Sequence, residues 1–248
     1  MKRYRGIEEL PIFRGVSKDT IHRMCTHGKI VTMKKGTVCY RANDRQSDIY
    51  ILLDGQAIIY TLTRCGNRKI IFILGGGEFL NESIITPGKT TVFCDVIAES
   101  RVFVIKNDVF CKLMEKDFTL VKAVMKIQER KLWRTSHQLK NTLGSIYLEK
   151  KLAAKLWKLA RDFGEPVYKK GISGNPEKEN IRIGVSLSIT FLADMLGAPR
   201  ETTSRLCKSL SERGFIQMEK KTIIVRNMDC LSNFYKNHCG EECHCSKN

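Results

Sequence analysis

Residues 188–207 form the segment that most constrains how this chain can fold. Apolar residues recur at helical spacing from Ile189 to Leu196, which predicts a short helix with one buried face. Gly197 follows at once, and glycine is the residue expected where a helix ends in a left-handed turn. Pro199 then opens a second helix, where the missing N–H of proline costs little. The segment therefore predicts a helix-turn-helix.

The outer face of the second helix carries side chains suited to reading DNA bases. Arginine can bond bidentately to guanine O6 and N7, and glutamate can accept from cytosine N4. Glu201 lies between two arginines, which favours base reading over the alternative of a capping glutamate among ordinary surface arginines. Thr203 and Leu206 also give this helix its inward face. We expect DNA contacts from Arg200, Glu201, Thr203, Ser204, Arg205 and Lys208.

Two short strands are predicted after this helix, within residues 214–226. The polar residues 219–222 (Glu-Lys-Lys-Thr) form the turn between them. A hairpin in this position makes a wing, from which Lys220, Lys221 and Arg226 can contact phosphates beside the groove. Together the two helices and the hairpin predict a winged helix-turn-helix.

The charge of the chain agrees with a nucleic-acid partner. Its 248 residues carry a formal net charge of +17, which implies an anionic partner. The sequence has no basic amphipathic anchor, no apolar run of membrane-spanning length and no secretory hydrophobic region. We therefore expect a cytoplasmic protein with no membrane partner. The sequence also lacks the phosphate-loop, dinucleotide, nucleophile-elbow and paired-carboxylate motifs, so we do not expect an enzyme.

The first half of the chain has a different character. Residues 29–105 consist of short runs rich in branched and aromatic residues, separated by turns every eight to twelve residues. This pattern predicts an antiparallel β-barrel or jelly roll, which either encloses a small ligand or is filled by side chains. Residues 54–55 (Asp-Gly) and 65–67 (Cys-Gly-Asn) are predicted hairpin turns, and a helix is expected around residues 17–25.

A long helical run, residues 108–143, follows the β-rich half. Its apolar and small polar residues alternate in steps of four and three, as in the seam of a two-stranded coiled coil. The seam comprises Val121, Met125, Gln128, Leu132, Thr135, Leu139 and Thr142. We favour a homodimer, because one recognition helix reads too few base pairs for useful specificity; the alternative is a helix that packs on its own barrel.

These predictions give an α+β chain in four segments. Residues 1–107 form the β-barrel sensor domain, and residues 108–145 form the dimerisation helix. Residues 146–228 form the winged helix-turn-helix domain, which begins with a helix over 146–163 and contains a short strand over 181–185. The remaining residues, 229–248, are a cysteine-rich tail.

This order of elements resembles the family of the cyclic-AMP receptor protein and the fumarate–nitrate regulator, the Crp/Fnr family. The resemblance spans nearly the whole chain. It is carried by residues 49–55 (Ile-Tyr-Ile-Leu-Leu-Asp-Gly), 75–82 (Gly-Gly-Gly-Glu-Phe-Leu-Asn-Glu), 135–136 (Thr-Ser) and 200–205 (Arg-Glu-Thr-Thr-Ser-Arg). It implies a cyclic-nucleotide-binding-like barrel and a homodimeric bacterial transcription factor. The expected target is double-stranded DNA with palindromic TGTGA- or TTGA-type half-sites, and RNA polymerase is an expected partner of an activator.

The resemblance also bears on the effector. Family members that bind cyclic nucleotides hold the phosphate with an Arg-Ser pair, and this chain places Val92 and Phe93 there. Without a guanidinium fork a buried phosphodiester loses its bidentate partner, so we do not expect cyclic AMP. The effector pocket implied by the resemblance comprises Glu82, Thr135 and Ser136, with Lys89 as a further cation.

The tail offers a second sensing site, because four cysteines lie close together within it. They are Cys230, Cys239, Cys243 and Cys245. Four thiolates can hold an iron–sulfur cluster or a tetrahedral zinc ion. The resemblance favours the cluster, whereas His238 and His244 suit zinc better. The cysteine spacing departs from the usual ligand gaps, and a reduced tail that binds nothing stays an alternative.

Two classes of function follow from the sequence. The favoured one is a sequence-specific transcription regulator gated by redox state, oxygen or a small effector. A regulator with no cofactor is an alternative within this class. The other class is a ligand- or metal-binding module whose helix-turn-helix contacts a protein. The regulated genes and the direction of regulation lie outside what the sequence predicts.

Overall fold

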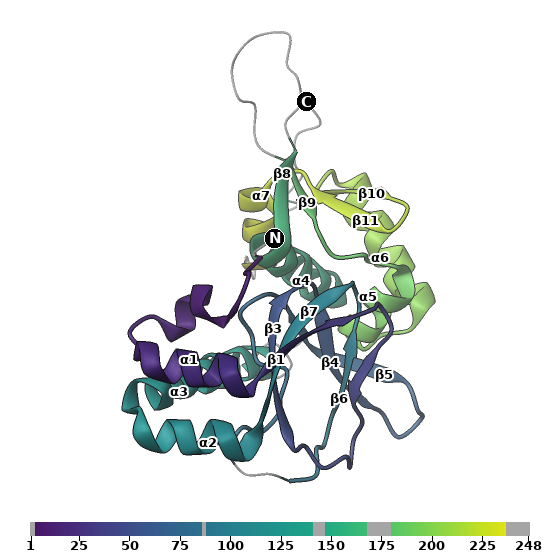
Figure 1. Ribbon diagram of the computed structural model, residues 1–248. Helices are drawn as coiled ribbons and strands as arrows, with labels where there is room; N and C mark the ends of the chain where they lie inside the picture. Colours follow the sequence, from purple (N-terminus) through teal and green to yellow (C-terminus); the bar gives the residue numbers. More distant parts are fainter. Residues whose placement is uncertain (1–2, 86–87, 141–146, 168–179, 237–248) are drawn as a thin grey trace, which may run out of the picture. The chain divides into compact units, whose positions relative to one another are not determined.

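A computed structural model describes residues 3–85, 88–140, 147–167 and 180–236 (Figure 1). The chain divides into two compact units, residues 2–139 and residues 140–248. Among the described residues, no helix combines the length and the apolar character needed to cross a membrane. The four-segment division predicted from the sequence stays a prediction.

The N-terminal unit contains seven strands in two antiparallel sheets within the described residues, as the sequence predicts. The strands are β1 (Lys29–Met33), β2 (Val38–Tyr40), β3 (Asp48–Asp54), β4 (Ala57–Leu62), β5 (Arg68–Leu74), β6 (Phe93–Val96) and β7 (Ser100–Lys106). One sheet has the order β1-β7-β3 and the other β2-β6-β4-β5. The two sheets make a β-sandwich.

Strand β3 contributes buried side chains to the hydrophobic clusters on both faces of its sheet. Ile49, Ile51 and Leu53 are fully buried and belong to a cluster that includes the helices of this unit. Leu52 points to the opposite face and joins the cluster between the two sheets. Successive side chains alternate across a strand, so this near-continuous apolar run serves two cores at once.

The two predicted hairpin turns have different outcomes. Residues 65–67 join β4 and β5, which pair as an antiparallel hairpin, so that prediction is confirmed. Residues 54–55 do form a tight turn, with Gly55 at a φ of 99°. However, β3 and β4 belong to different sheets, so the hairpin prediction is wrong there. The turn carries the chain from one sheet to the other.

The helices of the N-terminal unit lie beside the β1-β7-β3 sheet (Figure 1). They are the 3₁₀ turns η1 (Ile7–Glu9) and η2 (Pro11–Phe13), followed by α1 (Lys18–His27), α2 (Asn107–Lys116) and α3 (Phe118–Lys140). The helix expected near residues 17–25 is confirmed as α1, and Ser17 caps it by accepting from the Thr20 amide at 3.1 Å.

The prediction of one continuous helix over residues 108–143 is wrong, because the run is broken at Asp117. Asp117 has extended backbone angles, φ −131° and ψ 97°. Its carboxylate accepts from the Thr119 amide at 2.9 Å and the Leu120 amide at 3.3 Å, which caps the start of α3. The same carboxylate accepts from the Ser17 amide at 3.0 Å. One side chain therefore ends α2, begins α3 and ties both to the start of α1.

The C-terminal unit places helices around a four-stranded antiparallel sheet of order β10-β11-β9-β8. Its elements are α4 (Leu148–Phe163), β8 (Gly164–Val167), β9 (Asn180–Ile183), α5 (Ile189–Leu196), α6 (Arg200–Glu212), β10 (Ile216–Glu219), β11 (Thr222–Val225) and α7 (Met228–Lys236). The predicted first helix, helix-turn-helix, short strand and wing are all present. The sequence analysis did not anticipate β8 or α7.

Helix α7 contains the first residues of the predicted cysteine-rich tail. The segment 229–248 begins inside this helix, and α7 packs against α4. The Trp157 and Tyr235 rings lie 6.0 Å apart in an edge-on arrangement, and the Phe215 and Phe234 rings stack at 4.8 Å. The first residues of the predicted tail are therefore part of the core of this unit.

Asp117→Ala tests the role of the break between α2 and α3. We expect the free energy of unfolding to fall by about 1 kcal/mol at neutral pH, the usual value of a helix cap. Burial alone would raise the pKa of this carboxyl, but the hydrogen bonds from Ser17, Thr20 and Thr119 outweigh it and lower the pKa to about 2. The stabilisation is then full above the ordinary pKa of 3.8 and is lost as the pH falls through about 2.

Urea unfolding of the wild type and the variant at a series of pH values measures this difference. Glu115→Gln removes an exposed carboxylate from α2 and serves as the control, with no expected change. A wild-type advantage that is absent at neutral pH, or that grows on acidification, contradicts the assignment.

Candidate DNA-recognition surface and effector pocket

Local backbone chemistry sets the geometry of the helix-turn-helix. Ser188 caps α5 by accepting from the Phe191 amide at 3.1 Å. Gly197 ends this helix in the left-handed region, at a φ of 73°, and its amide donates to the Ala193 carbonyl at 2.7 Å. Pro199 then stands at the N-cap of α6, so the helix begins at Arg200, one residue later than predicted from sequence. The turn follows from residues 188–199 alone.

Helix α6 buries one face and exposes the other. Thr203, Cys207 and Leu210 are completely buried, at the spacing of three and four that marks one side of a helix. The exposed face carries Arg200, Glu201, Ser204, Arg205 and Lys208. These five predicted DNA contacts therefore share one solvent-facing surface near the N-terminal half of α6, which we call the recognition face.

The prediction that Thr203 contacts DNA is wrong. Its side chain is fully buried, and its hydroxyl donates to the Pro199 carbonyl at 3.0 Å. Thr203 therefore holds the first turn of α6 and is not available to a base. Leu206, also expected on the inward face, is only half-buried, because Cys207 takes the central position in the core. Burial raises the pKa of the Cys207 thiol to about 11.

The wing presents further cations to solvent. Lys220 and Lys221 form its tip between β10 and β11, and both are exposed. Lys220 adopts the left-handed conformation, with a φ of 53°, which closes the two-residue turn. Arg226 is also exposed, just after β11. The hairpin thus carries three positive charges on its exposed surface, as predicted.

A polar contact that sequence reasoning missed anchors the far end of α6. Glu149 on α4 accepts a hydrogen bond from Ser209 at 2.5 Å and lies 3.4 Å from the Arg213 guanidinium. Both charged side chains of this pair are about one-fifth exposed, so solvent screens the contact only partly. The residues are 60 or more positions apart, and no local pattern relates them. The contact fixes the direction in which the recognition face points.

The N-terminal unit contains a cavity of about 780 Å³ beside α3. It is lined by Ile59, Ile71, Phe72, Glu82, Thr91, Val92, Met125, Gln128, Glu129, Lys131, Leu132 and Thr135. The surface of the cavity is mostly apolar, although six of the twelve lining residues are polar or charged. A predominantly apolar surface with several polar groups is usual for a small-molecule site. We call this cavity the effector pocket.

The structure brings together only some of the effector residues predicted from sequence. Glu82 and Thr135 line the effector pocket. The Glu82 carboxylate accepts from the Thr91 amide at 2.7 Å and from the Thr91 hydroxyl. Lys89 lines a separate cavity of about 230 Å³, which Glu82 also borders. Ser136 is exposed on α3 and lines neither cavity.

The sequence analysis did not predict two largely buried cations near the pocket. Arg134 makes an ion pair with Glu78 at 2.6 Å, and both side chains are no more than one-fifth exposed. Lys131 donates to the Asn81 carbonyl at 2.8 Å. Burial lowers the pKa of Lys131 to about 8, against the opposing effect of Glu78. The glycine-rich run at residues 75–77 before Glu78 was the available signal, but it did not identify the cations.

The position expected to hold a cyclic-nucleotide phosphate lacks a guanidinium group. Val92 is buried against the pocket, and the Phe93 ring stacks on Tyr60 at 5.1 Å. Of the described residues that line the pocket, Lys131 is the one cation. The lining therefore offers no guanidinium fork for bidentate bonding to a phosphodiester.

The predicted cysteine site falls largely outside the described residues. Cys230 lies on α7 and is half-buried, and its amide donates to the Asn227 side chain at 2.9 Å. Cys239, Cys243 and Cys245 lie outside the described part of the chain. Within that described part, no three His, Cys, Asp or Glu side chains gather as a metal site would require.

Comparison with known proteins identifies both units. Residues 150–234 match the family described as the Crp-like helix-turn-helix domain, and residues 30–117 match the cyclic nucleotide-binding domain family. A curated relative, the CRP-like cAMP-activated global transcriptional regulator of Mycobacterium tuberculosis, is 22% identical over 222 residues, which cover 89% of this chain and 94% of that protein.

Solved structures share the fold. FixK2 from Bradyrhizobium japonicum superposes with a TM-score of 0.67 at 18% identity, covering 83% of this chain and 96% of that one. The c-di-GMP responsive global regulator CLP of Xanthomonas campestris superposes with a TM-score of 0.68 at 18% identity, covering 85% and 100% of the two chains. Both likenesses concern the fold alone.

Proposed function

The chain belongs to the Crp/Fnr family of DNA-binding transcription regulators, and we propose that it acts as a homodimer on a palindromic site with TGTGA- or TTGA-type half-sites. Its relatives are transcription regulators and not enzymes, in agreement with the sequence prediction. If it activates transcription, RNA polymerase is its further partner. Such a function places it in the cytoplasm.

The recognition face is the observation that carries this proposal. Its two arginines, its glutamate and its serine are exposed on one side of α6, while the opposite side is held in the core. Helices of this kind enter the major groove with their N-terminal residues against base edges. The exposed lysines of the wing belong to the same unit and can bind DNA phosphates. Phosphate contacts position a protein on DNA without reading its sequence.

The exposed apolar side chains of α3 support the dimer. Met125 is 62% exposed and Leu132 is 68% exposed, although both are large and apolar. They belong to the predicted seam, whose residues Gln128 and Thr135 are half-buried. The opposite face of α3 packs on its own unit, as residues such as Val124 show. One helix thus has a face for its own core and a face that a second copy can cover.

Two substitutions separate base reading from phosphate contact. Arg205→Ala should relax the base preference at one position, at a cost of about 1–3 kcal/mol for the preferred sequence. Lys221→Ala should weaken binding to all duplexes alike and reduce the slope of log affinity against log salt by about 1. Titration of both variants against a selected duplex and its single-base changes measures the two effects. If Arg205→Ala weakens all sequences equally, the recognition face has been assigned wrongly.

We further propose that the effector pocket takes a largely apolar molecule with one negative charge. The apolar walls favour burial of a ring or chain, and the Lys131 ammonium is the available partner for an anion. Arg134 already pairs with Glu78 and is not free for a ligand. Cyclic AMP remains excluded from this proposal because the phosphate position is occupied by Val92.

The dye anilinonaphthalene sulfonate, which is apolar and singly charged, is a suitable probe of this pocket. Its affinity should fall as the pH rises through about 8, because Lys131 then loses its proton. Lys131→Met should bind the dye more weakly at neutral pH and show no such pH response. Lys116→Met, on an exposed lysine of α2, is the control. An unchanged pH response in Lys131→Met would contradict the proposal.

We also propose that Cys230, Cys239, Cys243 and Cys245 hold an iron–sulfur cluster, or alternatively zinc, that makes DNA binding sensitive to oxygen or redox state. The dense thiols are the supporting feature, because unprotonated thiolates repel unless a soft cation binds them. Cys230 is the one member within the described residues, and its place on α7 would link the site to the core of the DNA-binding unit.

Anaerobic purification with iron, sulfide and zinc analysis tests the tail. Replacement of the four cysteines by serine should remove the bound metal and abolish any effect of air on DNA affinity. A variant with Cys25 and Cys65 changed to serine is the control, because both of these thiols are exposed in the other unit. Metal content that is the same in the wild type and in the four-serine variant eliminates the tail as a sensor.

A further inference from the structure

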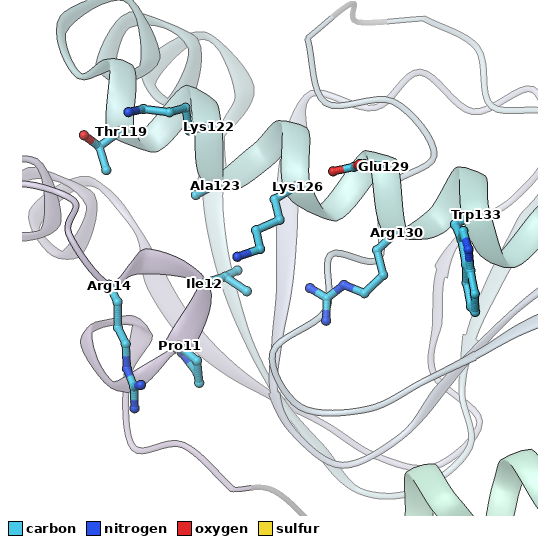
Figure 2. Close-up of a pocket in the computed structure, with 10 residues that line it drawn as sticks. All are labelled: Pro11, Ile12, Arg14, Thr119, Lys122, Ala123, Lys126, Glu129, Arg130 and Trp133. Carbon is cyan, nitrogen blue, oxygen red and sulfur yellow. The ribbon is translucent and has the colours of Figure 1, made fainter.

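A groove of about 860 Å³ runs along α3 in the N-terminal unit (Figure 2). It is lined by Pro11, Ile12, Arg14, Thr119, Lys122, Ala123, Lys126, Glu129, Arg130 and Trp133. The segment around η2 forms one wall and α3 forms the other. We call it the α3 groove. Apart from Glu129, which also lines the effector pocket, its residues belong neither to the recognition face nor to that pocket.

The α3 groove is strongly cationic. Lys122, Lys126 and Arg130 repeat every four residues and make a row along one side of α3, and Arg14 belongs to the facing wall. Figure 2 shows Lys126 and Arg130 reaching from the helix toward the η2 segment. All four cations are exposed, and in the described part of the chain none forms an ion pair. Glu129 is the one acidic residue of the lining.

This row is unfavourable for the isolated unit. Like charges four residues apart on a helix repel and destabilise it. The row also contributes nothing to the core, which α3 builds from residues such as Val124 and Ile127. An anionic partner would relieve the repulsion, so the row is better explained by binding than by folding.

The groove remains open in the dimer proposed above. Residues advance by roughly 100° around a helix axis. Lys126 and Arg130 therefore lie about 100° or more around α3 from Met125 and Leu132, whereas Lys122 lies about 60° from Met125. A second copy that covers the seam leaves Lys126 and Arg130 exposed.

The lining also has apolar elements that an inorganic anion would not use. Pro11, Ile12 and Ala123 lie between the two cationic walls, and Trp133 closes one end with its side chain 58% exposed. From Thr119 to Trp133 the helix extends over roughly 20 Å, at about 1.5 Å per residue. That length suits a peptide segment better than a small anion.

We propose that the α3 groove binds an acidic segment of a partner protein. Its carboxylates pair with Lys126, Arg130 and Arg14, and its apolar side chains pack on Ile12 and Trp133. Charge complementarity gives such a contact its specificity and its salt dependence, and the aromatic anchor supplies buried area.

The test selects short peptides from a random display library on the full-length dimer, with saturating duplex DNA present to cover the recognition face and wing. We expect the selected peptides to be rich in Asp and Glu with interspersed apolar residues. Lys126→Glu/Arg130→Glu should weaken their binding by about tenfold or more. Lys34→Glu/Lys35→Glu changes the net charge equally at exposed lysines outside the groove and should bind as the wild type does.

Tryptophan fluorescence locates the binding. The chain has two tryptophans, so Trp157→Phe leaves Trp133 as the single reporter. Its emission should change on addition of a selected peptide and not on addition of oligo-dT or tripolyphosphate. A basic version of the same peptide, with Lys in place of its acidic residues, should bind the Lys126→Glu/Arg130→Glu variant and not the wild type. This charge exchange also shows that the variant is folded.

Several results would overturn the proposal. Selected peptides may prove no more acidic than the library, or the two double variants may weaken binding equally, which would indicate bulk charge alone. If oligo-dT or tripolyphosphate binds more tightly than the peptides and displaces them, the groove is a nucleic-acid or inorganic-anion site. Should the double reversal fail to fold, Lys126→Gln/Arg130→Gln replaces it, and unchanged peptide affinity in that variant also refutes the proposal.

Discussion

The burial of a single face of α6 is the constraint on which the function of this molecule depends. Thr203, Cys207 and Leu210 leave no solvent-exposed surface, so the helix can take only one rotation about its axis. That rotation exposes Arg200, Arg205 and the polar residues between them. Glu149 adds a polar tie to the far end of the helix, through Ser209 and Arg213. The recognition face is thus a consequence of core packing and not of a loop that could adopt several shapes.

Helix α3 contributes residues both to the effector pocket and to the seam of the proposed dimer. Met125, Gln128, Leu132 and Thr135 line the effector pocket and also belong to the seam proposed for the dimer. A ligand that contacts these residues would alter the surface that meets the second copy. Ligand binding and dimer contact could then be coupled directly, because both would change the preferred conformation of the same side chains. The cationic row lies on another side of the same helix.

Features set by neighbouring residues were predictable from the sequence. The turn between α5 and α6 follows from Ser188, Gly197 and Pro199, and the wing follows from its polar tip. Features set by distant contacts were not. The break at Asp117 depends on Ser17, one hundred residues away, and the ion pair of Glu78 and Arg134 joins the barrel to α3. The sequence analysis assigned Thr203 both to the core and to DNA, because residue spacing alone does not show which group accepts the hydrogen bond of its hydroxyl.

The central claim is that two copies of the recognition face bind one duplex together. The most direct measurement takes the palindrome selected from random DNA and inserts about five base pairs, half a helical turn, between its half-sites. The account predicts tight binding of two chains to the original duplex and loss of that binding after the insertion, because one half-site then faces the opposite side of the DNA. Equal affinity for the original duplex, the lengthened duplex and a single half-site would contradict it.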